Sequence, residues 1–429
     1  MQTENLRELH KKEDNVIDGG GSEELRRENR EIHERRRIGN RKLKLLVLLI
    51  LFVALIVSGI VFFISSRRSY KSYKVVSSID TAFDSDSEYL EFAGNLLKYS
   101  PAGVSYINQS GETVWTAGVN MNSPIAEISD GYAVVADKGG NSVAVYNVDG
   151  EVTSETMPYK ICDVDISSSG AFVVVLESDS ANYTSMYSRV GDKIYEIKTS
   201  IKNSGYPVDV TLSDDGQKLF TSYLYLSGVT PKINLTAYNF GDVGQNENAD
   251  RMVGGYSFEE EMIPKVEFVS NDTVAAFADS EIIIYAMKEK PSEKVRIPYE
   301  TNILSIFYGK DYVGIIEKNA SVVLTGTATD SKRKASDSVY RMKVYDFSGN
   351  ERFSYDFDMD YERVIASDKE IIISGGSAID IVSMNGRSRF IYNFSAPVRN
   401  IIPTSGRNKY IITFDDRTET IKLSKKEEE

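Results

Sequence analysis

Residues 124–157 read PIAEISDGYAVVADKGGNSVAVYNVDGEVTSETM, and this segment is the clearest copy of a pattern that recurs along the chain. It contains four short runs rich in Val, Ile, Ala and Thr, separated by the turn-forming sequences SDG, KGGN and VDG. Such runs without helical periodicity are typical of β-strands. Because the turns between them are short, neighbouring strands should pair antiparallel. The segment therefore predicts one four-stranded antiparallel sheet.

The same pattern covers most of the chain. Further copies lie at residues 161–200, 207–241, 265–300, 303–357 and 363–394. The turn before the last strand of each copy falls at Gly111, Gly150, Gly191, Gly241, near Lys290, at Gly349 and at Gly386, with spacings of 37 to 59 residues. A four-stranded propeller blade usually occupies about 40 to 50 residues. Two β-sandwiches would explain the strands but not this period, so we predict a β-propeller.

The two ends of the repeat region set the number of blades. Asn95–Trp115 and Val398–Leu423 each supply three strands, which together exceed one blade. The ends therefore form two neighbouring blades or an exchanged pair, and the propeller has seven or eight blades, with eight favoured. We expect an all-β propeller over residues 89–424, followed by a charged tail at 425–429.

One segment before the repeats is strongly apolar. Leu45–Ile64 has no charged residue, and at about 1.5 Å per residue it is long enough to cross the hydrocarbon core of a bilayer. Nine basic residues lie between Arg26 and Lys44, against four between Arg67 and Lys74. This bias predicts a signal anchor with a partly helical cytoplasmic tail at 1–44, a membrane-spanning helix at 45–64, a linker at 65–88 and an extracytoplasmic propeller.

The overall composition limits the possible partners. The chain has 429 residues, 50 basic and 63 acidic, with a net charge of −13 and 41% hydrophobic residues. The apolar fraction excludes a disordered chain. The acidic balance argues against nucleic acid, because phosphate backbones need a basic surface. We expect lipid contact through 45–64 and a protein or an envelope polymer on the propeller face.

The repeat around the only tryptophan has a recognisable form. Val104–Trp115 reads VSYINQSGETVW, in which the turn glycine Gly111 precedes Trp115 by four residues. This resembles the pyrroloquinoline-quinone-type propeller repeat, in which such a tryptophan docks between blades, whereas the other copies resemble a generic WD40-like pattern. The layout of tail, anchor and acidic propeller is similar to that of a family of uncharacterised membrane-anchored envelope proteins from Gram-positive bacteria. The resemblance implies a fold and a location, and no activity.

Few residues suggest catalysis. Both histidines, His10 and His33, precede the apolar segment, so the propeller region has none for a Ser-His-Asp triad or a His-ligated metal. Cys162 is the only cysteine, and within a strand it should be a small buried side chain. The acidic residues at 356, 358, 360 and 362 alternate along one face of an extended segment, which is more typical of an exposed strand than of a cation site. We expect no cofactor and no metal.

One loop is a candidate binding element. Lys332, Arg333 and Lys334 form a basic group in a long insertion within an otherwise acidic region, and long loops on a rigid scaffold often bind partners. The sequence thus favours a non-catalytic binding, scaffolding or sensing module at the cell envelope. The alternative is an envelope enzyme that uses carboxylates, either carbohydrate-active or quinone-dependent. Carboxylates with perturbed pKa values that converge on the propeller axis would favour that alternative.

Overall fold

The computed structural model describes residues 47–57, 69–80, 86–202, 204–247, 249–299, 303–319 and 338–425. The chain divides into two compact units, residues 1–68 and residues 69–429. In the first unit, residues 47–57 are helical and lie within the predicted membrane span. No helix among the described residues is long and apolar enough to cross a membrane. The predicted tail at 1–44 and the remainder of the predicted span lie outside the described residues.

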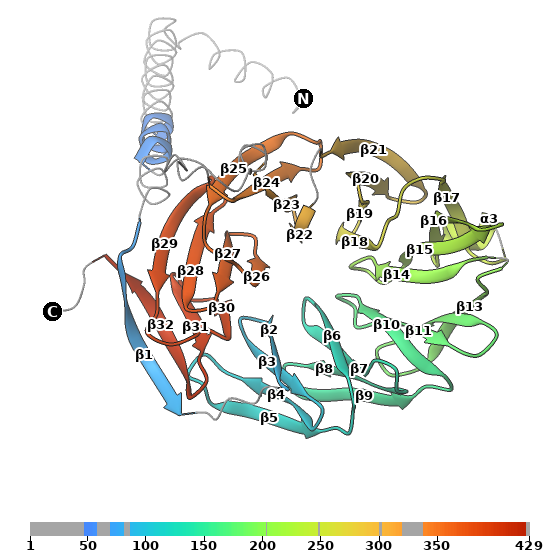
Figure 1. Ribbon diagram of the computed structural model, residues 1–429, viewed down its shortest axis with the longest axis horizontal. Coiled ribbons are helices and arrows are strands. Elements are labelled where there is room, and N and C mark those ends of the chain that lie inside the picture. The colour runs from blue at the N-terminus through green and yellow to red at the C-terminus, as the bar shows by residue number, and fades with distance from the viewer. Residues whose placement is uncertain are drawn as a thin grey trace, which may run out of the picture. The chain divides into compact units, whose positions relative to one another are not determined.

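The second unit is an all-β propeller with eight four-stranded antiparallel blades, which confirms the predicted fold and the favoured blade number (Figure 1). In blades 1 to 7 the strands follow chain order, and the first strand of each lies nearest the axis. Blades 1 and 2 consist of β2 (Glu88–Phe92), β3 (Asn95–Ser100), β4 (Gly103–Ile107) and β5 (Thr113–Gly118), then β6 (Pro124–Ser129), β7 (Tyr132–Asp137), β8 (Ser142–Asn147) and β9 (Gly150–Thr156). Blades 3 and 4 consist of β10 (Lys160–Ile166), β11 (Phe172–Glu177), β12 (Asn182–Tyr187) and β13 (Lys193–Thr199), then β14 (Tyr206–Leu212), β15 (Lys218–Ser227), β16 (Thr230–Asn239), the short helix α3 (Asp242–Glu247) and β17 (Met252–Phe258).

The next three blades follow the same plan. Blades 5 and 6 consist of β18 (Lys265–Ser270), β19 (Thr273–Phe277), β20 (Glu281–Met287) and β21 (Pro291–Pro298), then β22 (Ile303–Gly309), β23 (Tyr312–Lys318), β24 (Tyr340–Asp346) and β25 (Glu351–Phe357). Blade 7 consists of β26 (Arg363–Ala366), β27 (Glu370–Gly375), β28 (Ala378–Ser383) and β29 (Arg387–Asn393).

Blade 8 closes the ring with strands from both ends of the unit. It contains β30 (Asn400–Pro403), β31 (Lys409–Thr413) and β32 (Arg417–Ser424), and its outermost strand is β1 (Ser72–Asp80). β1 pairs antiparallel with β32, from Ser72 opposite Ser424 to Asp80 opposite Arg417. The prediction that residues 65–88 form a linker is therefore wrong for β1. The outermost position explains the error, because no side chain of β1 is fully buried and its sequence lacks a strong apolar pattern.

The core lies between blades rather than within one layer. Middle strands are buried on both faces, as in β11, where Phe172 to Leu176 are all buried. The outermost strands alternate between partly buried and exposed side chains, as in β13. Each of the seven larger clusters of buried apolar residues joins two neighbouring blades, so that Phe220 and Ile233 of blade 4 pack with Ile283 and Tyr285 of blade 5. Each blade is therefore stabilised mainly by its neighbours.

Candidate functional site

Trp115 lies on β5, at the outer border between blades 1 and 2. Its indole N–H donates a 3.0 Å hydrogen bond to the backbone carbonyl of Val148, in the turn between β8 and β9. The ring stacks on Tyr146 of blade 2, with centroids 5.4 Å apart, and on Tyr106 of its own blade at 5.8 Å. The side chain is half-buried and packs on the apolar cluster that blades 1 and 2 share. Trp115 thus joins these two blades.

Gly111 lies at the opposite border of blade 1. Its φ of +85° belongs to the left-handed region, and a Cβ at this position would come within 2.5 Å of Cδ1 of Ile79 on β1. The turn therefore needs glycine both for its backbone and for the close approach of blade 8. Blade 8 also bonds to blade 1 near the axis, where the side-chain amide of Asn400 donates to the carbonyl of Tyr89 at 3.2 Å. The two ends of the ring are therefore neighbours.

Other blades repeat this outer arrangement with different side chains. The Tyr256 hydroxyl of blade 4 donates to the carbonyl of Pro291 at 3.2 Å and accepts the N–H of Glu293 at 3.1 Å, both in blade 5. Phe353 of blade 6 lies beneath the turn glycine Gly386 of blade 7. These residues were not predicted from the sequence, because tyrosine and phenylalanine are common along the chain and only the single tryptophan stands out. An aromatic residue four positions after a turn glycine, as in Gly349 and Phe353, would have been the signal.

The inner border between blades is built from polar groups. Asp165 on β10 accepts the N–H of Leu212 on β14 at 2.6 Å. In the next blade, Asp209 on β14 accepts the N–H of Val266 on β18 at 2.7 Å. We call β6, β10, β14 and β18 the charged arc, because these consecutive innermost strands contact one another and carry the acidic residues near the axis. In the charged arc, side-chain oxygens of one blade satisfy backbone amides of the next.

Lys265 lies on β18, the last strand of the charged arc, and faces Asp209 on β14. Its Nζ is 3.3 Å from Oδ1 of Asp209 and 3.2 Å from Oε2 of Glu267. Burial alone would lower the pKa of Lys265, but Glu267 and Asp209 raise it, so this ammonium stays charged. Burial raises the pKa of Asp209 to about 7, although Lys265 opposes the rise. The ion pair thus compensates only part of the cost of burying Asp209.

The remaining acids of the charged arc repel one another. Burial raises the pKa of Asp163, with Lys265 opposing, and burial together with Glu267 and Glu127 raises that of Asp165. Glu127 keeps an exposed surface, but the strands packed around it reduce the hydration of its carboxylate, and together with the nearby acids they raise its pKa to about 8. The arc therefore contains carboxylates with perturbed pKa values, which is a common property of functional sites.

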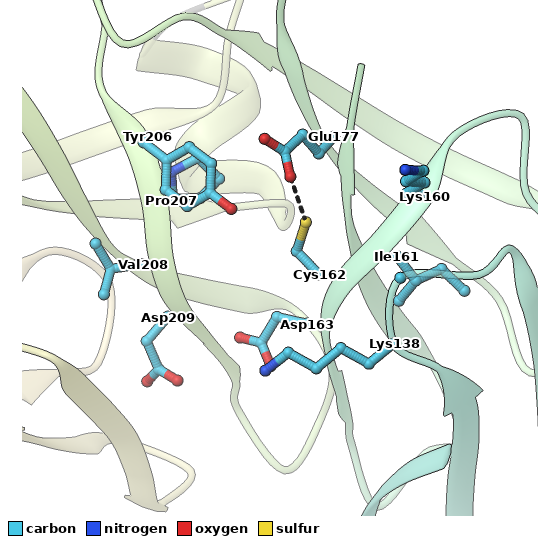
Figure 2. Close-up of a pocket in the computed structure, with 11 residues that line it drawn as sticks. Lys138, Lys160, Ile161, Cys162, Asp163, Glu177, Tyr206, Pro207, Val208 and Asp209 are labelled. Atoms are coloured by element: carbon cyan, nitrogen blue, oxygen red, sulfur yellow. Dashed lines mark hydrogen bonds between the residues drawn. The ribbon is translucent and has the colours of Figure 1, made fainter. Parts of the chain in front are cut away.

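A pocket of about 470 Å³ opens between blades 3 and 4, where β10 and β14 of the charged arc begin (Figure 2). Its lining comes from the turn after β7, from the starts of β10 and β14 and from the end of β11: Lys138, Gly139, Lys160, Ile161, Cys162, Asp163, Glu177, Tyr206, Pro207, Val208 and Asp209. The pocket is close to the usual size of small-ligand sites and presents charges of both signs. The pocket is therefore a candidate ligand site.

Cys162 lies in the wall of this pocket, between Glu177 and Asp163 (Figure 2). Its Sγ donates to Oε2 of Glu177 at 3.5 Å. Burial raises the pKa of the thiol, and the neighbouring Glu177 adds to the rise. A nucleophilic cysteine needs a lowered pKa and an electropositive setting, and Cys162 has neither.

The sequence offered two further candidates, the basic group in the long insertion and the acidic row. Lys332, Arg333 and Lys334 lie outside the described residues. In the acidic row, Asp356 forms two hydrogen bonds with Arg341, at 2.6 and 2.8 Å, and Asp358 accepts the N–H of Val339 at 2.8 Å. Across the residues that the structure describes, no group of three or more His, Cys, Asp or Glu side chains could hold a metal ion.

Comparison with known proteins places the fold among propellers. Sqt1 from Chaetomium thermophilum, in a structure bound to the N-terminus of the ribosomal protein L10, matches with a TM-score of 0.52 and 10% identity over 81% of this chain and 99% of that chain. BamB from Moraxella catarrhalis matches with a TM-score of 0.49 and 12% identity over 82% of this chain and 100% of that chain. Hsv2 from Kluyveromyces lactis matches with a TM-score of 0.44 and 10% identity over 81% of this chain and 99% of that chain. At these identities the likeness concerns the fold alone.

Sequence comparison gives a more specific result. No curated protein matches the chain. The model of a family of unknown function, DUF5711, matches residues 66–423, and the protein belongs to this family.

Proposed function

We propose that the protein is a membrane-tethered, extracytoplasmic propeller that binds a partner and catalyses no reaction. The observation that carries this proposal is the engagement of the inner-wall carboxylates. Asp165 accepts the N–H groups of Ile166 and Leu212 through its two oxygens, and Asp209 engages Lys265 and Val266 in the same way. Carboxylates that hold backbone amides and a lysine serve the scaffold and leave little capacity for acid–base chemistry.

The tether rests on the sequence. The apolar segment at 45–64 has the length of a membrane span, and its basic flanks favour a cytoplasmic N-terminus. On this basis the ring lies outside the cell. Binding by such a ring needs no catalytic set, because a propeller presents a broad rigid face to which loops and pockets can be added. The Sqt1 structure, in which a propeller is bound to a protein N-terminus, supports a protein partner over an envelope polymer.

A second function has one observation in its favour. The raised pKa of Glu127, close to Asp163 and Asp209, is the kind of perturbation that a carboxylate enzyme would use as a general acid. Such an enzyme also needs a second carboxylate free to act as base or nucleophile. Replacing Glu127 with Gln would abolish activity in an enzyme of this kind, and we expect partner binding to survive it.

Two measurements test the proposal. Protease added to intact cells should remove the ring and spare residues 1–44, while a cytoplasmic control protein stays intact. A peroxidase fused to the C-terminus of the full chain should label a partner protein. The control fusion carries the peroxidase directly after residue 68, in place of the ring, and should not label that protein. Protection of the ring from protease would overturn the topology. Identical labelling by both fusions would overturn the binding function.

A further inference from the structure

The pocket between blades 3 and 4 has charged groups of both signs in its lining that do not pair with each other. Lys160 on β10 and Glu177 on β11 stand directly opposite each other in the antiparallel ladder. Opposite charges in such positions usually attract each other across the strands. Here Glu177 accepts the thiol of Cys162 at 3.5 Å instead, and Lys160 forms no ion pair with a described residue. Both charges therefore line the pocket without an ion pair between them.

A second lysine enters the pocket from blade 2. Lys138 follows β7 and bridges to Ile161 at the start of β10. Its ammonium points toward Asp163 (Figure 2) but forms no ion pair with a described residue. Burial raises the pKa of Asp163, which also accepts the backbone N–H groups of Val164 and Val210. Asp163 is thus occupied by the scaffold and compensates the charge of Lys138 only in part.

The third carboxylate of the lining is also occupied. Asp209 engages Lys265 at 3.3 Å and the N–H of Val266 at 2.7 Å. The pocket therefore offers a ligand two ammonium groups, those of Lys138 and Lys160, and one carboxylate, that of Glu177. These charges nearly balance, so the lining favours neither a purely cationic nor a purely anionic molecule.

The wall between the charged groups is partly apolar. Three apolar residues contribute to the lining: Ile161, Pro207 and Val208. A volume of about 470 Å³ suits a small molecule. A ligand that matches this lining has a short apolar body with an anionic end and a cationic end.

We propose that this pocket binds a small zwitterion of the class of free-ended dipeptides, with its carboxylate at Lys138 and Lys160 and its ammonium at Glu177. A carboxylate has enough lone pairs to accept from both lysines, and an ammonium can donate to Glu177. The inference goes beyond the proposed function, because this ligand is a small molecule and not the partner protein.

The test uses the full chain purified in detergent and the dipeptide L-alanyl-L-alanine, with the Kd measured by saturation-transfer NMR. We expect saturable binding with a Kd below about 1 mM. N-acetylation of the dipeptide removes its cation, and amidation of its C-terminus removes its anion. Each derivative should bind at least about tenfold more weakly than the dipeptide, because one charge-assisted contact is lost.

Two variants assign the ends of the ligand. Glu177→Gln should weaken the dipeptide about tenfold and leave the acetylated derivative within about twofold, because that derivative has no ammonium to lose. Lys138→Gln should weaken the dipeptide about fivefold and leave the amidated derivative within about twofold, because that derivative has no carboxylate. Glu351→Gln, at an exposed site on blade 6, is the control and should leave every Kd within about twofold. Melting temperatures of the three variants verify that the fold is intact.

Several results would overturn the inference. Equal binding of the acetylated derivative and the dipeptide would show a site for anions, and equal binding of the amidated derivative would show a site for cations. Variants that weaken all three molecules alike, or no saturation up to about 10 mM, would show that these charges do not hold the ligand. Each of these results leaves the labelling test of the proposed function unaffected, so the two failures are distinguishable.

Discussion

The outer and inner borders between blades are held together by different chemistry. At the outer border, a side chain such as Trp115 or Tyr256 packs against the next blade and bonds to one of its carbonyls. At the inner border of the charged arc, Asp165 and Asp209 accept backbone amides of the next blade. The outer contacts bury aromatic surface and carry no charge. The inner contacts depend on the ionisation of buried carboxylates, so only they should respond to pH.

Removal of blade 8 should have the largest effect, because it breaks both kinds of border at once. Truncation after Pro397 deletes β30 to β32, leaves β1 without its partner and exposes the apolar faces of blades 1 and 7 that pack on blade 8. We expect no cooperative unfolding transition by circular dichroism. Truncation after Lys425, which keeps every strand of the blade, is the control and should melt like the parent. A cooperative transition in the Pro397 variant would show that ring closure is dispensable.

The Trp115→Ala variant tests the outer border alone. It removes a stacked aromatic ring and a hydrogen bond to Val148, so the free energy of unfolding should fall by about 3 kcal/mol. This value lies at the low end of the range for such changes because the ring is half-buried. Trp115→Phe keeps an aromatic ring and should lose about half as much. Denaturant unfolding at pH 5 and at pH 8 should give the same loss, since no charge is involved.

A melting temperature within a degree or two of the parent would contradict the docking role of Trp115. The residue would then be a surface side chain that is available to a ligand. Tyr256→Phe offers a comparison at the border of blades 4 and 5, where it removes only the hydroxyl and its two bonds. We expect this variant to lose about 1–2 kcal/mol of unfolding free energy, which measures the hydrogen bonds without the ring stacking.

The two borders also differ in how far they could be predicted from the sequence. The strand repeats, their period and the role of the ends follow from local patterns, because middle strands buried on both faces need continuous apolar runs such as FVVVL at 172–176. Trp115 and Gly111 stand out by residue type and spacing. The strand β1 was missed because an outermost strand buries little and needs no apolar pattern.

The charged arc could not be predicted in the same way. Asp165, Asp209 and Lys265 follow one another in the sequence at intervals of 44 and 56 residues, and each is one of many charged residues in strands. Only the closure of the ring brings them together, and local sequence does not encode which carboxylate will face a backbone amide of the next blade. The pocket beside Glu177 arises in the same way, from three blades whose edges meet.

The pH dependence of stability tests the inner border. The pKa of Asp209 is about 7 in the folded protein, against 3.8 as its ordinary value. Between these values the folded state binds the proton and the unfolded state does not, so the free energy of unfolding should fall as pH rises. This contribution is complete below about pH 4 and is lost as pH rises through about 7. At about 1.4 kcal/mol per pH unit, we expect a loss of about 2–3 kcal/mol between pH 5 and pH 8.

The raised pKa of Glu127 also makes the free energy of unfolding fall as pH rises, and it extends this decrease towards pH 8. Asp209→Asn should flatten the curve of melting temperature against pH, because Asn does not titrate and can still accept the N–H of Val266. Glu351→Gln, far from the charged arc, should leave the slope unchanged. A melting temperature that rises from pH 5 to pH 8 would show that Lys265 stabilises the ionised Asp209 more than burial destabilises it.

The smallest expected effect lies at the outer border and depends on a pair of matched glycines. Gly111 and Gly131 have almost the same φ, +85° and +86°, but a Cβ at Gly111 would meet Cδ1 of Ile79, whereas a Cβ at Gly131 would meet nothing within 4 Å. Gly131→Ala should therefore cost about 1 kcal/mol, the backbone penalty alone. Gly111→Ala should cost a few tenths of a kcal/mol more, because the flexible end of Ile79 can move aside. The excess should shrink in an Ile79→Val background, which lacks the Cδ1 atom that comes nearest. Urea unfolding of the four variants and the parent measures this coupling. Equal losses of unfolding free energy for Gly111→Ala and Gly131→Ala in the parent would mean that Ile79 of blade 8 moves aside without a penalty. The inner hydrogen bond from Asn400 to Tyr89 would then be the contact that stabilises this border.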